Sequence, residues 1–426
     1  MSEPPAFTRR EFLTSTLAMV STVTSVPTFL SRSAAALADT TMRTASRPGV
    51  PEDRVLVVVQ LSGGNDGLNT VIPFGEPAYY RARPQLALPE KSVLPVDRGR
   101  GIGLHPSLAQ LRSMMEEGLA SVVQGVGYPN PNRSHFASMD VWHTGDTTGR
   151  GGHGHGWIGQ ALDAEQAKGT PRSGMECICL GAEAPLAAQG RKVRPVAFER
   201  ADLFRWIGRD LHPALDAAYD ALHQAGPAGD EEHDPAAFVF RTACDAQVAS
   251  QRVRKAVAAR PATSFPSGEL ANQLRMVASM IRAELPTRVY YVAMGGFDTH
   301  ANQAGQHERL LREFAQAMHA FYRELEASGH SQRVLSLAFS EFGRRVQQNA
   351  SGGTDHGTAG PMFLFGPRIR PGLLGNHPSL DRLDQGDLIH QVDFRSIYAA
   401  VLEQWMQVDS AAALGARYKP AQILRV

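Results

Sequence analysis

Residues 334–361 read VLSLAFSEFGRRVQQNASGGTDHGTAGP, and this stretch indicates how the chain folds. The apolar run 334–339 has the composition of a buried β-strand. It is followed by Glu341, and a loop rich in Gly, Ser and Asn then leads to Asp355 and His356. Ligands of parallel α/β sheets usually bind beyond the carboxyl ends of the strands. We therefore ask which other segments end in polar residues of the same kind.

Three more apolar runs end in this way. They are 54–61 (RVLVVVQL), followed by Asn65 and Asp66; 119–126, followed by Ser134 and His135; and 288–294 (RVYYVAM), followed by Asp298 and His300. Carboxylate, amide and imidazole groups are ligands of divalent cations. Each segment alone is also explained as a plain turn or a helix cap. The four strand ends together predict one shared metal site.

Ser134 precedes a segment of helical character, 137–143. The unpaired N–H groups of a helix N-terminus favour anions, which would suit a nucleophilic hydroxyl and a phosphate or sulfate group. A simple helix cap explains the same serine equally well. Arg133 and Arg344 are candidates for clamping substrate oxygens, because guanidinium groups bind oxyanions bidentately, with solvated surface arginines as the alternative.

Helical segments alternate with the apolar runs. The spacing predicts helices in 106–118, in a long segment from His307 and in a C-terminal segment around Trp405. Residues from about 200 to 285 are rich in Ala, Leu, Arg and Glu and contain several prolines, which predicts a helical insertion. Alternating strands and helices indicate an α/β domain over 54–426 with a mostly parallel sheet.

The N-terminus has the features of an export signal. Residues 8–13 read TRREFL, a twin-arginine pattern, and a weakly apolar segment with small residues near Ala38 follows. A membrane-spanning helix is the alternative, but the segment is short and is interrupted by Pro27. We predict a signal peptide over 1–38, a linker over 39–53, and a periplasmic or secreted protein.

Charge and cysteine content exclude several classes. The formal net charge is +1, which does not favour nucleic acid as a partner. Cys177 and Cys179 are two apart in a predicted strand, so they share a face and are poorly placed to bond to each other. We expect both to be buried, and a bridge from either to Cys244 stays open. The lack of a thiolate-rich ligand set argues against a redox metalloenzyme.

Several motifs together resemble a known family. They are the twin-arginine leader, VVVQLSGGNDGLNTVIP, QGVGYPNPNRSHF, GGFDTHANQ, FSEFGR and GTDHGTAGPMF. They resemble the exported bacterial proteins of domain-of-unknown-function family 1501, which is distantly similar to the alkaline phosphatase and sulfatase superfamily. The resemblance implies a three-layer α/β/α fold with a central, mostly parallel sheet.

The resemblance also implies roles for single residues. Asp66 or Asn65 resembles the first metal ligand of the superfamily, and Ser134 stands at the place of its nucleophile. Asp298 with His300 looks like a ligand pair and His356 like the late histidine ligand. Glu341 stands where an Asp is usual, and Phe342 departs from the pattern by replacing a histidine. The number of ions therefore stays open, and zinc, calcium, manganese and magnesium are all candidates.

These features predict an exported, metal-dependent hydrolase of phosphate or sulfate esters. Ser134 would attack, and Asn65, Asp66, Asp298, His300, Glu341 and His356 are the candidate ligands. The substrate would be a small anionic ester or an anionic polymer. The alternative is a non-catalytic binding or assembly protein that keeps the fold and contacts an exported partner protein, and Phe342 favours it.

Overall fold

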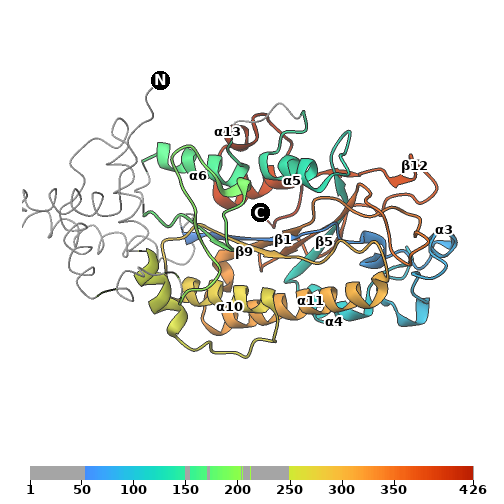
Figure 1. Ribbon diagram of the computed structural model, residues 1–426, viewed down its shortest axis with the longest axis horizontal. Helices are drawn as coiled ribbons and strands as arrows, with labels where there is room; N and C mark the ends of the chain where they lie inside the picture. Colours follow the sequence, from blue (N-terminus) through green and yellow to red (C-terminus); the bar gives the residue numbers. More distant parts are fainter. Residues whose placement is uncertain are drawn as a thin grey trace, which may run out of the picture.

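The computed structural model describes residues 53–148, 154–169, 173–202, 204, 212 and 249–425. The predicted signal peptide, almost all of the linker, Cys244 and much of the predicted helical insertion lie outside these ranges. Figure 1 shows a sheet seen nearly edge-on with helices above and below it. Within the described ranges, no helix is both long enough and apolar enough to cross a membrane.

A nine-stranded sheet forms the centre of the molecule. Its order is β11-β5-β10-β9-β1-β8-β6-β7, and β14 also pairs with β5. The strands are β1 (Val55–Leu61), β5 (Ala120–Gly127), β6 (Cys177–Leu180), β7 (Val196–Phe198), β8 (Val289–Met294), β9 (Val334–Phe339), β10 (Gly360–Phe365), β11 (Gly372–Leu374) and β14 (Val392–Asp393). The four apolar runs and the strand predicted at Cys177 and Cys179 are therefore all present as strands.

β1 lies between β8 and β9 and is parallel to both. Its side chains alternate between the faces of the sheet: Val57 and Val59 join one hydrophobic cluster, and Leu56 and Val58 join the other. Both faces need apolar residues because helices cover both, which explains the continuous apolar run. Cys177 and Cys179 are buried in one cluster, as expected, and they are not bonded to each other.

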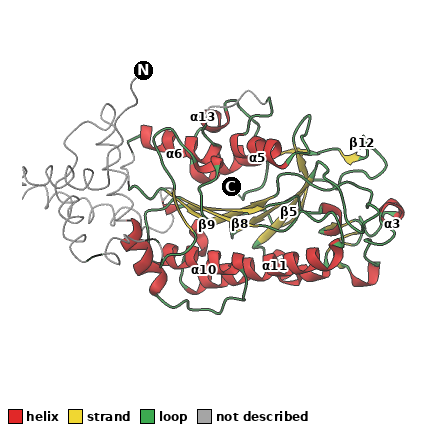
Figure 2. Ribbon diagram, viewed as in Figure 1, coloured by secondary structure: helices red, strands yellow, loops and turns green. Residues whose placement is uncertain are grey.

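Two layers of helices cover the sheet (Figure 2). On one side lie α4 (Ala109–Glu116), α10 (Glu269–Arg282) and α11 (Gln303–Ala327), which are labelled in Figure 1. On the other lie α5 (His135–Thr144), α6 (Trp157–Ala167) and α13 (Ser410–Leu414), with α12 (Phe394–Ala400) and a π-helical turn (Val401–Met406) packed in the same cluster. The fold is thus the predicted three-layer α/β/α arrangement, and α11 begins four residues before His307.

Smaller elements surround these layers. They are α3 (Pro77–Ala82), a sheet of β2 (Val71–Ile72), β4 (Ile102–Leu104) and β3 (Leu94–Asp97), a hairpin of β12 (Leu383–Asp384) and β13 (Asp387–Leu388), and 3-10 turns at Gly67–Asn69, Glu90–Ser92, Pro106–Leu108, Leu186–Ala188 and Ser331–Arg333.

β10 runs antiparallel to both of its neighbours, β9 and β5. The segment between β9 and β10 contains no helix, and a parallel crossover normally requires one. Because two reversals separate β5 from β9, these two strands point the same way. The carboxyl ends of β1, β5, β8 and β9 therefore lie along one edge of the sheet.

Candidate metal centre

Three loops at this edge bring together His135, Asp298 and His356. One possible ligand atom from each residue lies within 4.8 Å of those of the other two. In the described part of the chain, these three side chains form a group that could hold a metal ion. His135 is the first residue of α5, Asp298 follows β8, and His356 lies in the loop after β9. The His356 Nε2 is 3.1 Å from Asp298 Oδ1, and the His135 Nε2 is 3.5 Å from Asp298 Oδ2.

His300 adds a third imidazole beside this group. Its Nε2 lies 3.1 Å from Asp298 Oδ1 and 2.9 Å from the Nε2 of His356. Donors bound to one small ion at about 2.1 Å stand roughly 3 to 3.5 Å apart, so these spacings suit a shared divalent cation. The structure thus brings Asp298, His300 and His356 together and adds His135.

Each imidazole has a partner on its other ring nitrogen. The Nδ1 of His135 is 2.8 Å from Glu341 Oε1, that of His356 is 2.8 Å from the Arg133 carbonyl oxygen, and that of His300 is 3.3 Å from Asp355 Oδ1. A carbonyl oxygen only accepts, so the Nδ1 of His356 donates and a neutral ring keeps a lone pair on Nε2. Histidine ligands of metals are usually oriented in this way.

Glu341 lies behind the centre and is oriented toward a histidine. Its carboxylate accepts hydrogen bonds from the N–H groups of Gly63 at 2.8 Å and Gly64 at 3.3 Å, and from the Ser340 hydroxyl at 3.0 Å. The side chain is 2 % exposed and contacts His135. Glu341 therefore contacts the group of candidate ligands through His135.

Arg344 is buried and joins the loops that carry the centre. Its guanidinium donates to the carbonyl oxygens of Gly64 at 2.7 Å and Thr354 at 2.8 Å, and to Asp298 Oδ1 at 2.8 Å. Burial alone would raise the pKa of Asp298, but hydrogen bonds from Arg344 and His356 and the charge of Arg344 lower that pKa to about 2. Arg344 therefore keeps Asp298 ionised, and its guanidinium is 0 % exposed and engaged inside the protein.

Asn65 and Asp66 are not part of the group that the three loops form. Asp66 makes a buried ion pair with Arg83 at 2.6 Å, and both side chains are 0 % exposed. The Asn65 Oδ1 accepts from the Thr70 hydroxyl at 3.0 Å and lies 3.0 Å from the His307 Nε2. Both residues thus belong to a buried polar network beside the first strand.

Ser134 occupies the N-cap position of α5, but its side chain makes no capping hydrogen bond. It is exposed, and its N–H donates to Asn132 Oδ1 at 2.8 Å. Arg133 donates through Nε to Asp387 Oδ2 at 2.7 Å, so its guanidinium already has a carboxylate partner. Ser134 is thus exposed and directly precedes His135, whereas the guanidinium of Arg133 is engaged.

Phe342 forms an apolar wall of the centre. It is 3 % exposed, and its ring centroid lies 5.0 Å from that of His135 and 4.6 Å from that of His356. A Cβ at Gly64 would lie 2.3 Å from the Phe342 ring, so only glycine fits there. Phe342 thus holds two imidazoles in place from the side and offers no ligand.

The sequence signal for His135 was its place directly after Ser134, in a strand-end cluster. The sequence alone does not predict His135 as a ligand, because the direction of a side chain in the first turn of a helix depends on how that helix packs. The partners Arg83 and Asp387 carried no sequence signal, because an ion pair between distant segments depends only on the fold.

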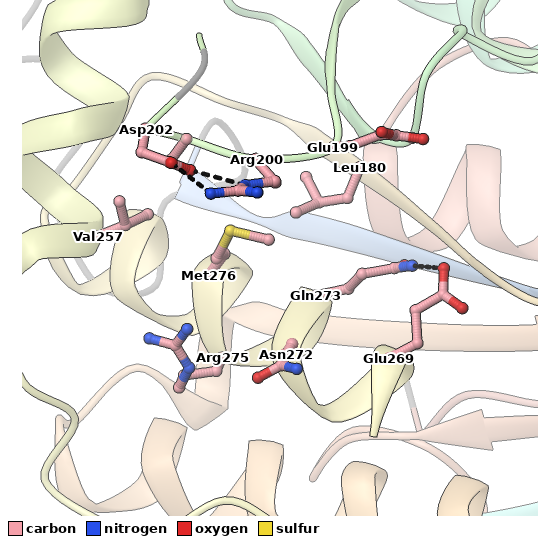
Figure 3. A pocket seen from close by; sticks show the side chains of 12 residues that line it. Leu180, Glu199, Arg200, Asp202, Val257, Glu269, Asn272, Gln273, Arg275 and Met276 are labelled. Atoms are coloured by element: carbon pink, nitrogen blue, oxygen red, sulfur yellow. Dashed lines mark hydrogen bonds and ion pairs between the residues drawn. The ribbon is translucent and has the colours of Figure 1, made fainter. Parts of the chain in front are cut away.

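A cavity of about 560 Å³ lies elsewhere on the molecule (Figure 3). Gln273 and Met276 of α10 line it together with Arg200 and Asp202, which form an ion pair with each other. None of the four residues of the candidate centre lines this cavity, so the two features are separate.

Fold and site define an α/β protein with a candidate metal centre at the carboxyl edge of its sheet. The family model described as "Protein of unknown function (DUF1501)" matches residues 99–410, and the chain belongs to that family. A comparison with curated protein sequences finds no match.

Solved structures resemble the chain at low identity. The lipoteichoic acid synthase LtaP from Listeria monocytogenes is 10 % identical over 75 % of this chain and 67 % of that chain, with a TM-score of 0.35. The PsFucS1 sulfatase from Pseudoalteromonas sp. is 10 % identical over 93 % and 78 %, with a TM-score of 0.35. An alkaline phosphatase from the Antarctic bacterium TAB5 is 11 % identical over 75 % and 94 %, with a TM-score of 0.30.

Proposed function

We propose that the protein is an exported metal-dependent hydrolase of phosphate or sulfate esters. The observation that carries this proposal is the convergence of three imidazole Nε2 atoms on Asp298, each ring being oriented from behind through its Nδ1. Such an arrangement requires the ordering of several polar groups and the burial of the two that support them, Glu341 and Arg344, which a plain surface loop does not need. Export rests on the predicted signal peptide over 1–38.

The donor set fits a divalent cation. His135, Asp298, His300 and His356 together offer three nitrogens and a carboxylate, which suits zinc or manganese better than the oxygen-preferring calcium or magnesium. A bound ion would supply positive charge that polarises an ester and stabilises the developing negative charge on its oxygens. Phe342 occupies one side of the centre, which favours a single ion.

The residues of the chain itself have separate tasks in this proposal. Ser134 is exposed at the N-terminus of α5, where the helix dipole favours an anionic group. Its Oγ would form a bond to phosphorus or sulfur while the bond to the leaving alcohol breaks. Water would then cleave the serine ester, and solvent would take up and return the protons. Glu341 and Asp355 hold the imidazoles in orientation throughout.

Two measurements together test this function. Elemental analysis of protein purified without added metal should give about one ion per chain, and Asp298→Asn and His356→Ala should lose it. A panel of phosphate and sulfate esters should reveal turnover that Ser134→Ala abolishes while the ion is retained. A preparation with far less than one ion per chain and no Ser134-dependent turnover would exclude the hydrolase.

A non-catalytic binding protein is the second candidate. It is favoured by the engagement of Arg133 with Asp387 and of Arg344 with Asp298, which leaves neither guanidinium directed at a substrate oxyanion. This candidate predicts a protein that holds an ion but turns over no ester in the panel. The same two measurements therefore separate it from the hydrolase.

A further inference from the structure

Two large hydrophobic side chains are exposed in the described part of the chain, Phe136 at 86 % and Ile389 at 39 %. Phe136 lies in the first turn of α5, directly after His135 and two residues after Ser134. The buried face of α5 is formed by later residues, Val141 and Trp142 among them. Phe136 precedes all of these residues and is 86 % exposed, so it contributes nothing to the core.

Ile389 lies on a segment that is anchored to the same place from two sides. It follows β13, in which Asp387 accepts a hydrogen bond from Arg133 Nε at 2.7 Å. Leu388, which lies between Asp387 and Ile389, accepts a hydrogen bond through its carbonyl oxygen from the Thr358 hydroxyl at 2.6 Å. Thr358 is two residues beyond His356. The two exposed side chains thus lie on segments that flank the candidate metal centre.

The exposure of Phe136 has a measurable energetic meaning. A phenylalanine side chain removes about 150 to 250 Å² of surface from water when it is covered, and this burial is favourable. Scattered apolar side chains are normal on a protein surface, whereas apolar side chains gathered at a polar site mark a binding surface. Phe136 directly follows His135 of the candidate centre, and Ile389 follows two residues that are hydrogen-bonded to Arg133 and Thr358.

We propose that Phe136 and Ile389 form an apolar rim that binds the hydrophobic organic group of the substrate, an aryl or alkyl group, while its anionic group meets the metal centre. This inference rests on the proposed function and specifies its substrate class. The cation nearest in sequence to this rim, Arg133, is paired with Asp387, so the rim offers contact area without a free charge. Esters with a small polar alcohol would gain nothing from it.

Binding of two non-hydrolysable probes to the metal-loaded full chain tests the rim. Phenylphosphonate and methylphosphonate share the anionic group and differ only in the apolar part. Calorimetry should give a phenylphosphonate affinity at least about tenfold higher, since burying one apolar ring surface is worth about 1.4 kcal/mol or more. Phe136→Ala should remove most of this preference, Ile389→Ser part of it, and Phe136→Trp should retain it.

The outcomes separate the rim from other roles of Phe136. If Phe136→Ala weakens both probes equally, the side chain positions His135 and the rim is refuted. If the wild type binds both probes with equal affinity, the rim is refuted while the proposed function stands. If the protein binds neither probe, both proposals are overturned. If Phe136→Ala turns a dimer into a monomer in light scattering, a second copy covers the patch and the rim is likewise refuted.

Discussion

Glu341 and Asp66 are buried carboxylates that differ in the partner each one holds. Glu341 is bound by two backbone N–H groups and contacts His135, whereas Asp66 neutralises Arg83 inside the protein. Both follow a central strand in the sequence, and both looked like metal ligands. Their partners make one a positioning residue of the centre and the other a stabilising residue of the fold.

Glu341→Gln should weaken metal binding without removing a ligand. The amide keeps the size of the side chain but loses the charge that orients His135, and loss of such a partner typically costs 10- to 100-fold in metal affinity. Competition with a chromophoric chelator measures the change. Asp355→Asn is the control, because that carboxylate is exposed and should matter less. Complete loss of the ion, as in Asp298→Asn, would show that Glu341 is itself a ligand.

Asp66→Asn should destabilise the protein by about 3 to 5 kcal/mol at neutral pH, because it leaves the buried charge of Arg83 uncompensated. Urea unfolding measures the loss. Glu116→Gln breaks the exposed pair with Arg112 and should change the free energy of unfolding by less than about 1 kcal/mol. Equal effects of the two substitutions would contradict the buried-pair interpretation.

The same pair predicts a pH dependence. Burial would raise the pKa of Asp66, but the charge of Arg83 and the hydrogen bonds from Arg83 and Gln303 act together and lower that pKa in the folded state. A lowered pKa stabilises the fold above the unfolded value of about 3.9, and this contribution is lost as the pH falls through the folded value. Urea midpoints from pH 6 down to pH 3 should fall more steeply for the wild type than for Asp66→Asn.

At the scale of elements, close backbone contacts decide how some helices pack. Gly159 of α6 lies against the backbone of Gln189 and Gly190, where an added Cβ would be 2.2 Å from the carbonyl carbon of Gln189. Gly305 of α11 has nothing within 4 Å of such a Cβ. An added methyl group would therefore clash with the backbone at Gly159 and would meet open space at Gly305.

Gly159→Ala should therefore destabilise the protein, since α6 must move away from the neighbouring segment, and overpacking of this kind typically costs about 1 to 3 kcal/mol. Gly305→Ala should stabilise it by up to about 1 kcal/mol, because alanine has the higher helix propensity and meets no atom. Thermal unfolding of both variants measures the two signs. If Gly159→Ala leaves the free energy of unfolding unchanged, α6 packs less closely against Gln189 and Gly190 than the structure shows.

At the scale of the whole molecule, the candidate centre joins loops from distant parts of the chain. His135 and Glu341 are 206 residues apart, and His300 and His356 are 56 apart. An ion bound to these loops stabilises the folded chain but not the unfolded one. Binding and folding should therefore be coupled.

Addition of zinc or manganese at about 100 times its dissociation constant should raise the free energy of unfolding by about 2.7 kcal/mol. A chelator should reverse the effect. His356→Ala should abolish the stabilisation, while His319→Ala, which changes a histidine of α11 outside the centre, should leave it intact. A wild type that unfolds identically with and without either ion would count against the centre.

Local patterns account for much of the fold. The four apolar runs became β1, β5, β8 and β9, and Cys177 and Cys179 are buried on one face, because burial on both sides of a sheet selects continuous apolar sequence. The antiparallel direction of β10 could not be predicted from the sequence, because the direction of a strand depends on the connection before it and not on the residues of the strand. The leader, the linker and the extent of the insertion remain predictions.

The sequence by itself determined the α/β class and placed Asp298, His300 and His356 beyond strand ends, because periodicity and polar breaks are local properties of the chain. Only the tertiary structure decided that His135 joins them, that Glu341 stands behind it, and that Asp66 turns to Arg83. These choices depend on the distances between side chains from different loops, and a buried carboxylate takes whichever cation or N–H group the packed fold brings to it.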